Sequence, residues 1–156
     1  MVRTAFELRY TDLSVNIMKK ICSSFLATSA MTTFSYIFSF LSRANLREPH
    51  ILAQLINRLM PWRRKKRNIL TGWLLHYAVG LLFTEMYVQF WRNSSPNSEK
   101  KDGLIFGGLA GLAAILIWNF TLSIHPYAPP INFGLFALNL FLGHILFGIV
   151  SSFTYP

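Results

Sequence analysis

Ionisable side chains within long apolar segments are the first candidates for chemistry in this chain. His76, Glu85 and His144 each lie inside such a segment, and His125 stands at the end of another. An ionisable group inside a lipid bilayer is costly, so it usually serves a function. Because histidine exchanges its proton near neutral pH, a series of these groups could carry a proton or an ion. We therefore take His76, His144 and Glu85 as candidate intramembrane functional residues, and His125 as a candidate interfacial residue.

The expected depths of these groups argue against a shared ligand. Counted from the side where the segments holding the two histidines begin, at about 1.5 Å per residue, His76 lies about 10 Å deep, His144 about 20 Å and Glu85 about 24 Å. Two histidines on one haem iron would need nearly equal depths. The single cysteine and the lack of an HExxH motif remove the other common ligand patterns. We accordingly expect no metal and no cofactor.

Each candidate also has a purely structural interpretation. A neutral histidine on a glycine-lined helix face can donate one hydrogen bond to a neighbouring helix and only fix the packing. Glu85 follows His76 by nine residues, which places it on the opposite helix face, together with Gln89 and Arg92. His125 precedes a proline and can cap carbonyl groups at a helix end. We expect no catalytic residue, because the sequence shows no nucleophile with a base, no paired acids and no phosphate-binding loop.

Four apolar segments must position these residues. The chain has 156 residues, of which 53% are hydrophobic and only 13% are charged, and its mean hydropathy is +0.38. A soluble domain this small needs a larger share of polar surface. Crossing about 30 Å of hydrocarbon takes about 20 apolar residues in a helix. The sequence therefore predicts an all-α integral membrane protein with four transmembrane helices, at residues 21–41, 69–91, 103–124 and 131–152.

The segments between the spans predict how the helices are connected. The polar stretch 92–102 contains a proline and is expected to form a solvent loop. Three prolines within 125–130 predict a short, stiff turn between the last two spans. In the middle of 43–68, apolar residues recur at helical spacing over a stretch too short to span. This pattern predicts an amphipathic helix on the membrane surface.

The first span is the least apolar of the four, because eight Ser and Thr residues dilute it. A signal peptide is the alternative interpretation, but the apolar run continues past Ala30 with no polar mature domain behind it. We therefore keep this segment as a membrane anchor. Met18 and the two lysines after it are typical of a natural start. We interpret residues 1–17 as a non-native extension and residues 18–156 as a single membrane domain.

The positive charges are concentrated between the apolar segments. The formal net charge is +9, but this clustering favours a membrane partner over a nucleic acid. Cations next to a span attract anionic lipid headgroups by about 1 kcal/mol each and favour the cytoplasmic side. We therefore place the loop 43–68 in the cytoplasm and interpret its basic residues as a topology anchor, with a specific headgroup or nucleic-acid site as the alternative interpretation of these residues. The densest run follows Trp62 and consists of Arg63, Arg64, Lys65, Lys66 and Arg67, defined here as the basic cluster.

Small residues predict how the helices pack. Helices in lipid associate where small side chains let their backbones approach. Gly103, Gly107 and Gly111 fall four residues apart on one face of the third span, which predicts a close contact with another helix. His76 and His144 also lie on faces with small residues, so both should point inward. Four short helices enclose only a narrow path, which makes a homo-oligomer the expected assembly of a permeation protein.

Three short segments carry a resemblance to a group of known proteins. Residues 27–31, 72–80 and 143–148 resemble parts of small four-helix membrane proteins of bacteria. The resemblance implies a four-helix architecture in the bacterial inner membrane and draws attention to His76 and His144. It implies no particular activity.

Three functional hypotheses follow from the sequence. The first is a small transport or permeation protein that uses intramembrane histidine and glutamate groups. The second is a structural or assembly protein of the membrane, in which the histidines only fix packing. The third is a membrane protein that binds a cofactor.

Overall fold

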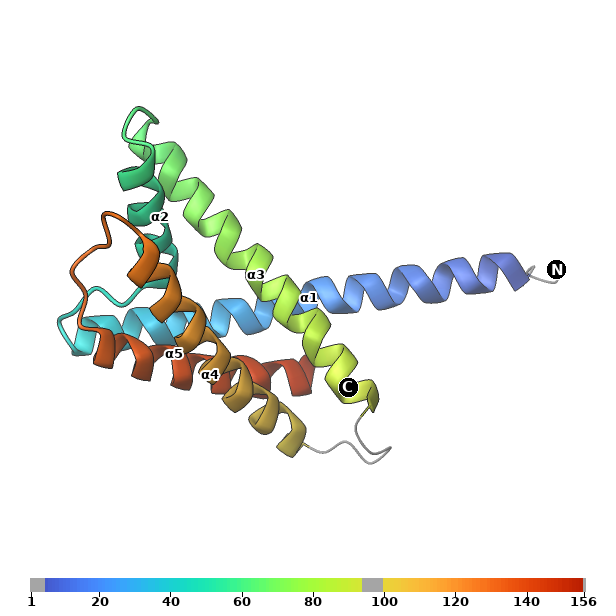
Figure 1. Cartoon of the computed structure of the whole chain (residues 1–156). Helices are drawn as coiled ribbons and strands as arrows, with labels where there is room; N and C mark the ends of the chain where they lie inside the picture. The colour runs from blue at the N-terminus through green and yellow to red at the C-terminus, as the bar shows by residue number, and fades with distance from the viewer. Residues whose placement is uncertain (1–4, 94–99, 156) are drawn as a thin grey trace.

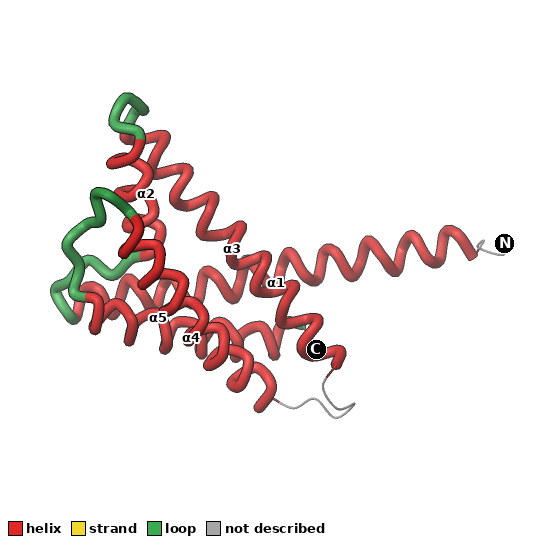
Figure 2. Tube along the Cα trace, in the orientation of Figure 1, coloured by secondary structure: helices red, strands yellow, loops and turns green. Residues whose placement is uncertain are grey.

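The computed structural model describes residues 5–93 and 100–155, and these form helices joined by short loops (Figures 1 and 2). Two expectations fall partly outside these residues: the polar loop 92–102 includes 94–99, and the extension 1–17 includes 1–4. Within the described ranges the chain forms no strand. The five helices are α1 (Ala5–Leu41), α2 (Glu48–Leu59), α3 (Lys65–Asn93), α4 (Lys100–Ile124) and α5 (Phe133–Thr154).

Four of these helices are long and apolar enough to cross a membrane, as the sequence predicts. Three of the four spans begin before their predicted starts and contain lysines near that end, whose charged groups can extend toward the headgroups while their stems stay in the apolar layer. Residues 5–17 belong to the same helix as the first span. The candidate spans are Val15–Leu41, Lys65–Arg92, Lys101–Ile124 and Phe133–Thr154.

The helices differ in how closely they pack. α5 lies against both α4 and α1, whereas α3 crosses α1 and has little contact with α4 or α5 (Figure 1). α3 therefore runs diagonally away from the other three spans, and its first turns lie far from the start of α5. This divergence leaves room between α3 and α4, which α2 partly fills.

Glycines make the close contact between α4 and α5. A Cβ atom at Gly103 would lie 2.5 Å from the carbonyl oxygen of Gly148, and one at Gly107 would lie 2.5 Å from that of His144. At Gly111 it would lie 3.1 Å from the backbone of Phe141. The three glycines of the predicted stripe thus all lie at a helix contact. Gly107 in particular allows the backbone of His144, a candidate functional residue, to lie close to α4.

α2 is amphipathic, but its apolar face packs on protein where the sequence suggested lipid. Ile51 and Leu55 are buried, and α2 lies along α3 near Gly72. The helix begins with the buried residue Glu48 and ends at exposed apolar side chains such as Leu59. Only the end of α2 that leads to the basic cluster is thus available to contact a membrane surface.

Most of the eight hydroxyl groups that dilute the first span face the interior of the bundle, whereas Thr33 is exposed. Five of the buried ones recur every three or four residues and form one stripe along α1. Most of them bond to helix carbonyls or to polar groups of other elements, which removes the penalty for their burial. The buried members of this stripe are Ser24, Thr28, Thr32, Ser35 and Ser39.

Candidate functional site

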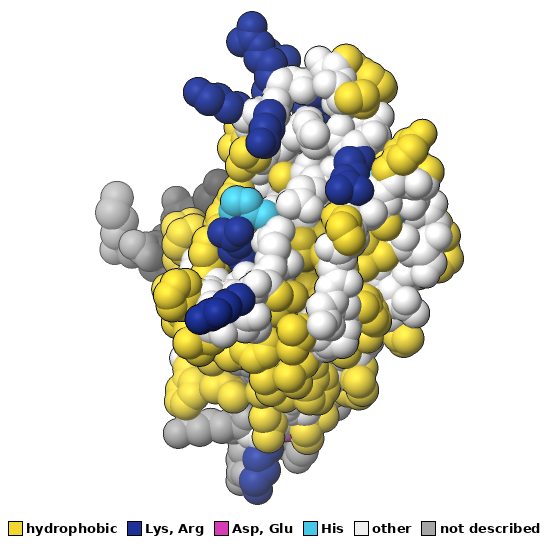
Figure 3. Space-filling view, turned by 90° about the vertical axis from the view of Figure 1, so that its left-hand side faces the viewer, with side chains coloured by type: hydrophobic (Ala, Val, Ile, Leu, Met, Phe, Trp, Pro, Cys, Tyr) yellow, Lys and Arg dark blue, Asp and Glu magenta, His cyan; other side chains and the backbone are white. Residues whose placement is uncertain are grey.

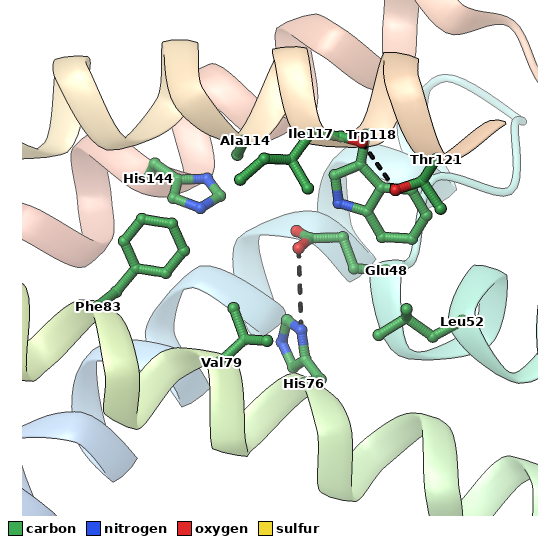
Figure 4. A pocket seen from close by; sticks show the side chains of 10 residues that line it. All are labelled: Glu48, Leu52, His76, Val79, Phe83, Ala114, Ile117, Trp118, Thr121 and His144. Atoms are coloured by element: carbon green, nitrogen blue, oxygen red, sulfur yellow. Dashed lines mark hydrogen bonds and ion pairs between the residues drawn. The ribbon is translucent and has the colours of Figure 1, made fainter. Parts of the chain in front are cut away.

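A cavity of about 140 Å³ lies between α2, α3, α4 and α5, where α3 diverges from the other spans (Figure 4). Its lining is mostly apolar but includes three ionisable side chains from three different helices. This combination is typical of a ligand or proton-binding site. The lining residues are Glu48, Leu52, His76, Val79, Phe83, Ala114, Ile117, Trp118, Thr121 and His144.

Glu48 is the acidic member of this cluster, and the sequence analysis missed it. The side chain is 7% exposed, and within the described part of the chain it has no cationic partner unless His76 is protonated. Burial raises the pKa of Glu48 from 4.5 to about 8, so the carboxyl group holds a proton near neutral pH. One signal was present in the sequence: Glu48 shares a helix face with Ile51 and Leu55, which are apolar. An acid on that face must be buried.

His76 presents a hydrogen-bond acceptor to Glu48. The Thr32 hydroxyl donates to the carbonyl oxygen of Thr28 at 2.6 Å, so its oxygen accepts the Nε2–H of His76 at 2.8 Å. In the neutral ring, Nδ1 then carries the lone pair, and it lies 3.8 Å from Oε2 of Glu48. Glu48 and His76 thus face each other as an acid and a base (Figure 4).

His144 completes the cluster from α5. Its Nδ1–H donates to the Leu140 carbonyl oxygen at 2.7 Å, which leaves the lone pair on Nε2. The ring packs edge-on against Phe83, with centroids 5.3 Å apart, and it points into the cavity (Figure 4). A second basic nitrogen therefore borders the same space as Glu48 and His76.

A smaller void extends this cluster toward α1. It has a volume of about 20 Å³, which is room for about one water molecule. Thr28 lines it together with Glu48, His76 and His144. The Thr28 Oγ1 is buried and has no protein partner among the described residues, so it can bond to a water there.

The depth count did not predict that His76 and His144 share a cavity. It placed them about 9 Å apart along the bilayer normal, whereas the structure shows both histidines in the lining of one cavity. The count assumed that the two helices start at the same level and run parallel. α3 instead starts at Lys65, apart from the start of α5, and runs diagonally (Figure 1). In the part of the chain that the structure describes, no three His, Cys, Asp or Glu side chains lie close enough to hold a metal ion.

Glu85 lies apart from this cluster. Lys20 donates to its Oε2 at 2.6 Å, and Gln89 donates to its Oε1 at 3.4 Å. The Glu85 side chain is 41% exposed and does not line the cavity. The sequence placed it on the opposite helix face from His76, with Gln89 beside it. The lysine partner, 65 residues away in the chain, was not foreseen.

His125 links the turn between α4 and α5 to α2. Its Nδ1 accepts the backbone N–H of Tyr127 at 3.1 Å, so its Nε2–H donates to the Leu55 carbonyl oxygen at 3.2 Å. Arg58 holds the same turn, because Nη1 donates to the carbonyl oxygens of Tyr127 and Ala128 at 3.0 and 3.1 Å. His125 therefore fixes α2 against the turn and does not face the cavity.

The basic cluster stands at the tip where α2 leads into α3. Trp62 is 78% exposed, and Arg64, Lys65, Lys66 and Arg67 are exposed as well. Figure 3 shows Lys and Arg side chains gathered at this end of the molecule, above a largely apolar surface. An aromatic ring and cations at the end of an apolar helix are typical of the headgroup layer.

The comparisons with known proteins do not extend this picture. The likeness of segments 27–31, 72–80 and 143–148 to small bacterial membrane proteins stays a prediction. Any functional assignment therefore depends on the geometry around Glu48, His76 and His144. No protein-family model, no curated protein and no solved structure matches the chain.

Proposed function

We propose that this protein is a small membrane transport protein that moves protons, or a solute coupled to protons, through the cavity between α2 and α5. The observation that carries the proposal is the convergence of Glu48, His76 and His144 on one buried space. Burying ionisable groups costs free energy, so they usually serve a function. Proton movement requires several neighbouring groups that can accept and release a proton in turn.

The chemistry of the three groups supports a proton relay. Near neutral pH the protonated Glu48 is the donor, because burial raises its pKa to about 8. The Nδ1 lone pair of His76 is the first acceptor, and transfer turns a neutral pair into a carboxylate beside an imidazolium. Their opposite charges limit the cost of separating charge inside the protein. Nε2 of His144 is the second acceptor across the cavity.

The surroundings of the relay support a polar route into it. Thr28 and Thr32 lie beside the cluster, and the hydroxyl stripe of α1 continues on both sides of them. Hydroxyl groups can both donate and accept a hydrogen bond, so they can connect waters to the histidines. The apolar remainder of the cavity lining limits how much water can enter.

Orientation and assembly belong to the same proposal. The basic cluster is proposed to contact anionic lipids on the cytoplasmic side of a bacterial inner membrane. A homo-oligomer is proposed as the working form, because the cavity is small and is lined in part by α3 and α4, which have little contact with each other.

A flux measurement tests the proposal. The protein is reconstituted into liposomes that contain a pH-sensitive dye, and a potassium diffusion potential drives proton entry. We expect the wild-type protein to acidify the interior, and Glu48→Gln to reduce the flux to that of protein-free liposomes. Glu85→Gln is the matched control, because it changes a carboxyl group outside the cavity.

Two results would count against the proposal. Full flux in a folded Glu48→Gln variant removes Glu48 from the path. No flux in the wild-type protein, under conditions where size-exclusion chromatography shows it folded, leaves the structural function as the better account. In that account the histidines only fix the helix packing.

A further inference from the structure

A second cavity, of about 260 Å³, lies at the opposite face of α2, between α2 and the first turn of α3. It is lined mainly by polar side chains, unlike the cavity of Glu48, and none of its lining residues is acidic. It therefore offers positive charge and amide groups together. The polar lining residues are His50, Gln54, Asn57, Arg58, Lys65 and Asn68.

The charge of this cavity comes from Arg58 and Lys65. His50 adds none near neutral pH, because burial and the guanidinium of Arg47 lower its pKa. Two cations beside the N-terminus of a long helix favour an anion, and phosphate is one of the anions that such places bind.

Asn68 indicates a further property of the ligand. Its side chain is 1% exposed and lines the cavity. Nδ2 donates to Oδ1 of Asn57 at 3.0 Å, but Oδ1 of Asn68 has no partner among the described residues. A buried acceptor without a donor is unfavourable. A ligand that also carries a hydroxyl donor would satisfy it.

The position of the cavity fits a membrane lipid. Lys65 is the first residue of the α3 span, and Trp62 and the basic cluster are next to it. These features place the cavity at the level of the headgroups. We propose that this cavity binds a phosphate group with a hydroxyl-bearing substituent, as in a phosphatidylglycerol headgroup.

Thermal unfolding of the full chain in detergent tests this site without any flux measurement. A ligand that binds only the folded state raises the melting temperature. Dioctanoyl phosphatidylglycerol is titrated at constant ionic strength, with dioctanoyl phosphatidylmethanol as the lipid that keeps the charge but lacks the hydroxyl groups. Glycerol phosphate is the soluble source of the same chemistry.

We expect phosphatidylglycerol to raise the melting temperature more than phosphatidylmethanol does. Lys65→Gln should weaken the binding about fivefold, whereas Lys66→Gln, which removes the same charge outside the cavity, should not. Asn68→Leu should abolish the preference for the hydroxyl-bearing lipid. A shift with glycerol phosphate as large as that with the lipid supports the site and identifies a soluble ligand.

Two outcomes would overturn the proposal. The first is no rise in melting temperature with either glycerol-bearing phosphate. The second is an equal loss in Lys65→Gln and Lys66→Gln, which indicates only diffuse attraction to the basic tip. If Asn68→Leu fails to fold, the lysine pair still decides between these outcomes.

Discussion

Glu48 and Glu85 are two carboxyl groups that the same chain places in opposite environments. Glu85 is partly exposed and paired with Lys20, so its charge is neutralised where it stands. Glu48 is buried in an apolar cavity and faces a histidine. A lysine stabilises the carboxylate form, which has no proton to give. A buried protonated acid beside a neutral base can instead transfer its proton to that base. The position of an ionisable side chain inside a membrane span is therefore a weaker sign of function than its burial and the partner that it faces.

The largest effect that separates the two acids is the pH dependence of stability. The pKa of Glu48 is raised in the folded protein from 4.5 to about 8. Between those values the unfolded chain releases the Glu48 proton while the folded chain keeps it, so the contribution of Glu48 to stability falls as the pH rises. Over the whole window this contribution falls by about 5 kcal/mol.

Melting temperatures in detergent at a series of pH values from 4.5 to 8 check this. Relative to the wild type, Glu48→Gln should lose the falling contribution of Glu48, and Glu85→Gln should retain it. An equal slope in the wild type and in Glu48→Gln would show that the acid is not buried as described.

The sequence was sufficient for most of the fold but for only part of the site. Length and hydropathy determine the four spans, because a bilayer sets the length of an apolar helix. The glycine stripe of α4 also predicted a helix contact, since small residues at four-residue spacing have few other uses in lipid. These are local patterns, which a sequence states directly.

The site depends on helix angles, which are not local. His76 and His144 were recognised as candidates, but their meeting depends on the diagonal course of α3. Glu48 was missed because a lone acid in a basic loop resembles a solvated residue, and only the insertion of α2 buries it. The Lys20 partner of Glu85 depends equally on how α1 and α3 cross.

The next largest effect concerns the wall of the cavity that carries His144. In Gly107→Ala the new methyl group would overlap the carbonyl oxygen of His144, so α4 and α5 must separate. We expect a loss of about 1–3 kcal/mol in unfolding free energy. Gly108→Ala is the control, because nothing lies within 4 Å of its Cβ position. Chemical denaturation in detergent compares the two, and equal stabilities would contradict the close helix contact.

A smaller effect is expected from the anchor of His76. Thr32→Val removes the oxygen that accepts from Nε2–H and should cost about 1 kcal/mol. Thr33→Val also removes a hydroxyl that donates to a carbonyl four residues earlier, but Thr33 is exposed and bonds to no histidine that the structure describes. Thermal unfolding of both variants measures the difference. A larger loss in Thr33→Val would argue against the anchoring role of Thr32.

The smallest effect is expected from removing the lysine partner of Glu85. Exposed ion pairs contribute less than about 1 kcal/mol. Lys20→Met should therefore lower the unfolding free energy only slightly, and proton flux should stay at the wild-type level. Lys19→Met removes the same charge one position earlier and serves as the control. Loss of flux in Lys20→Met alone would mean that Glu85 also takes part in proton movement.

Infrared spectroscopy of the reconstituted protein tests the central claim most directly, because the C=O stretch of a protonated carboxyl group is resolved from that of a carboxylate. The account predicts a protonated band at neutral pH that is lost with a midpoint near the pKa of Glu48, about 8. The band should be missing in Glu48→Gln and retained in Glu85→Gln. Absence of the band in the wild type, or its persistence in Glu48→Gln, would contradict a proton held by Glu48.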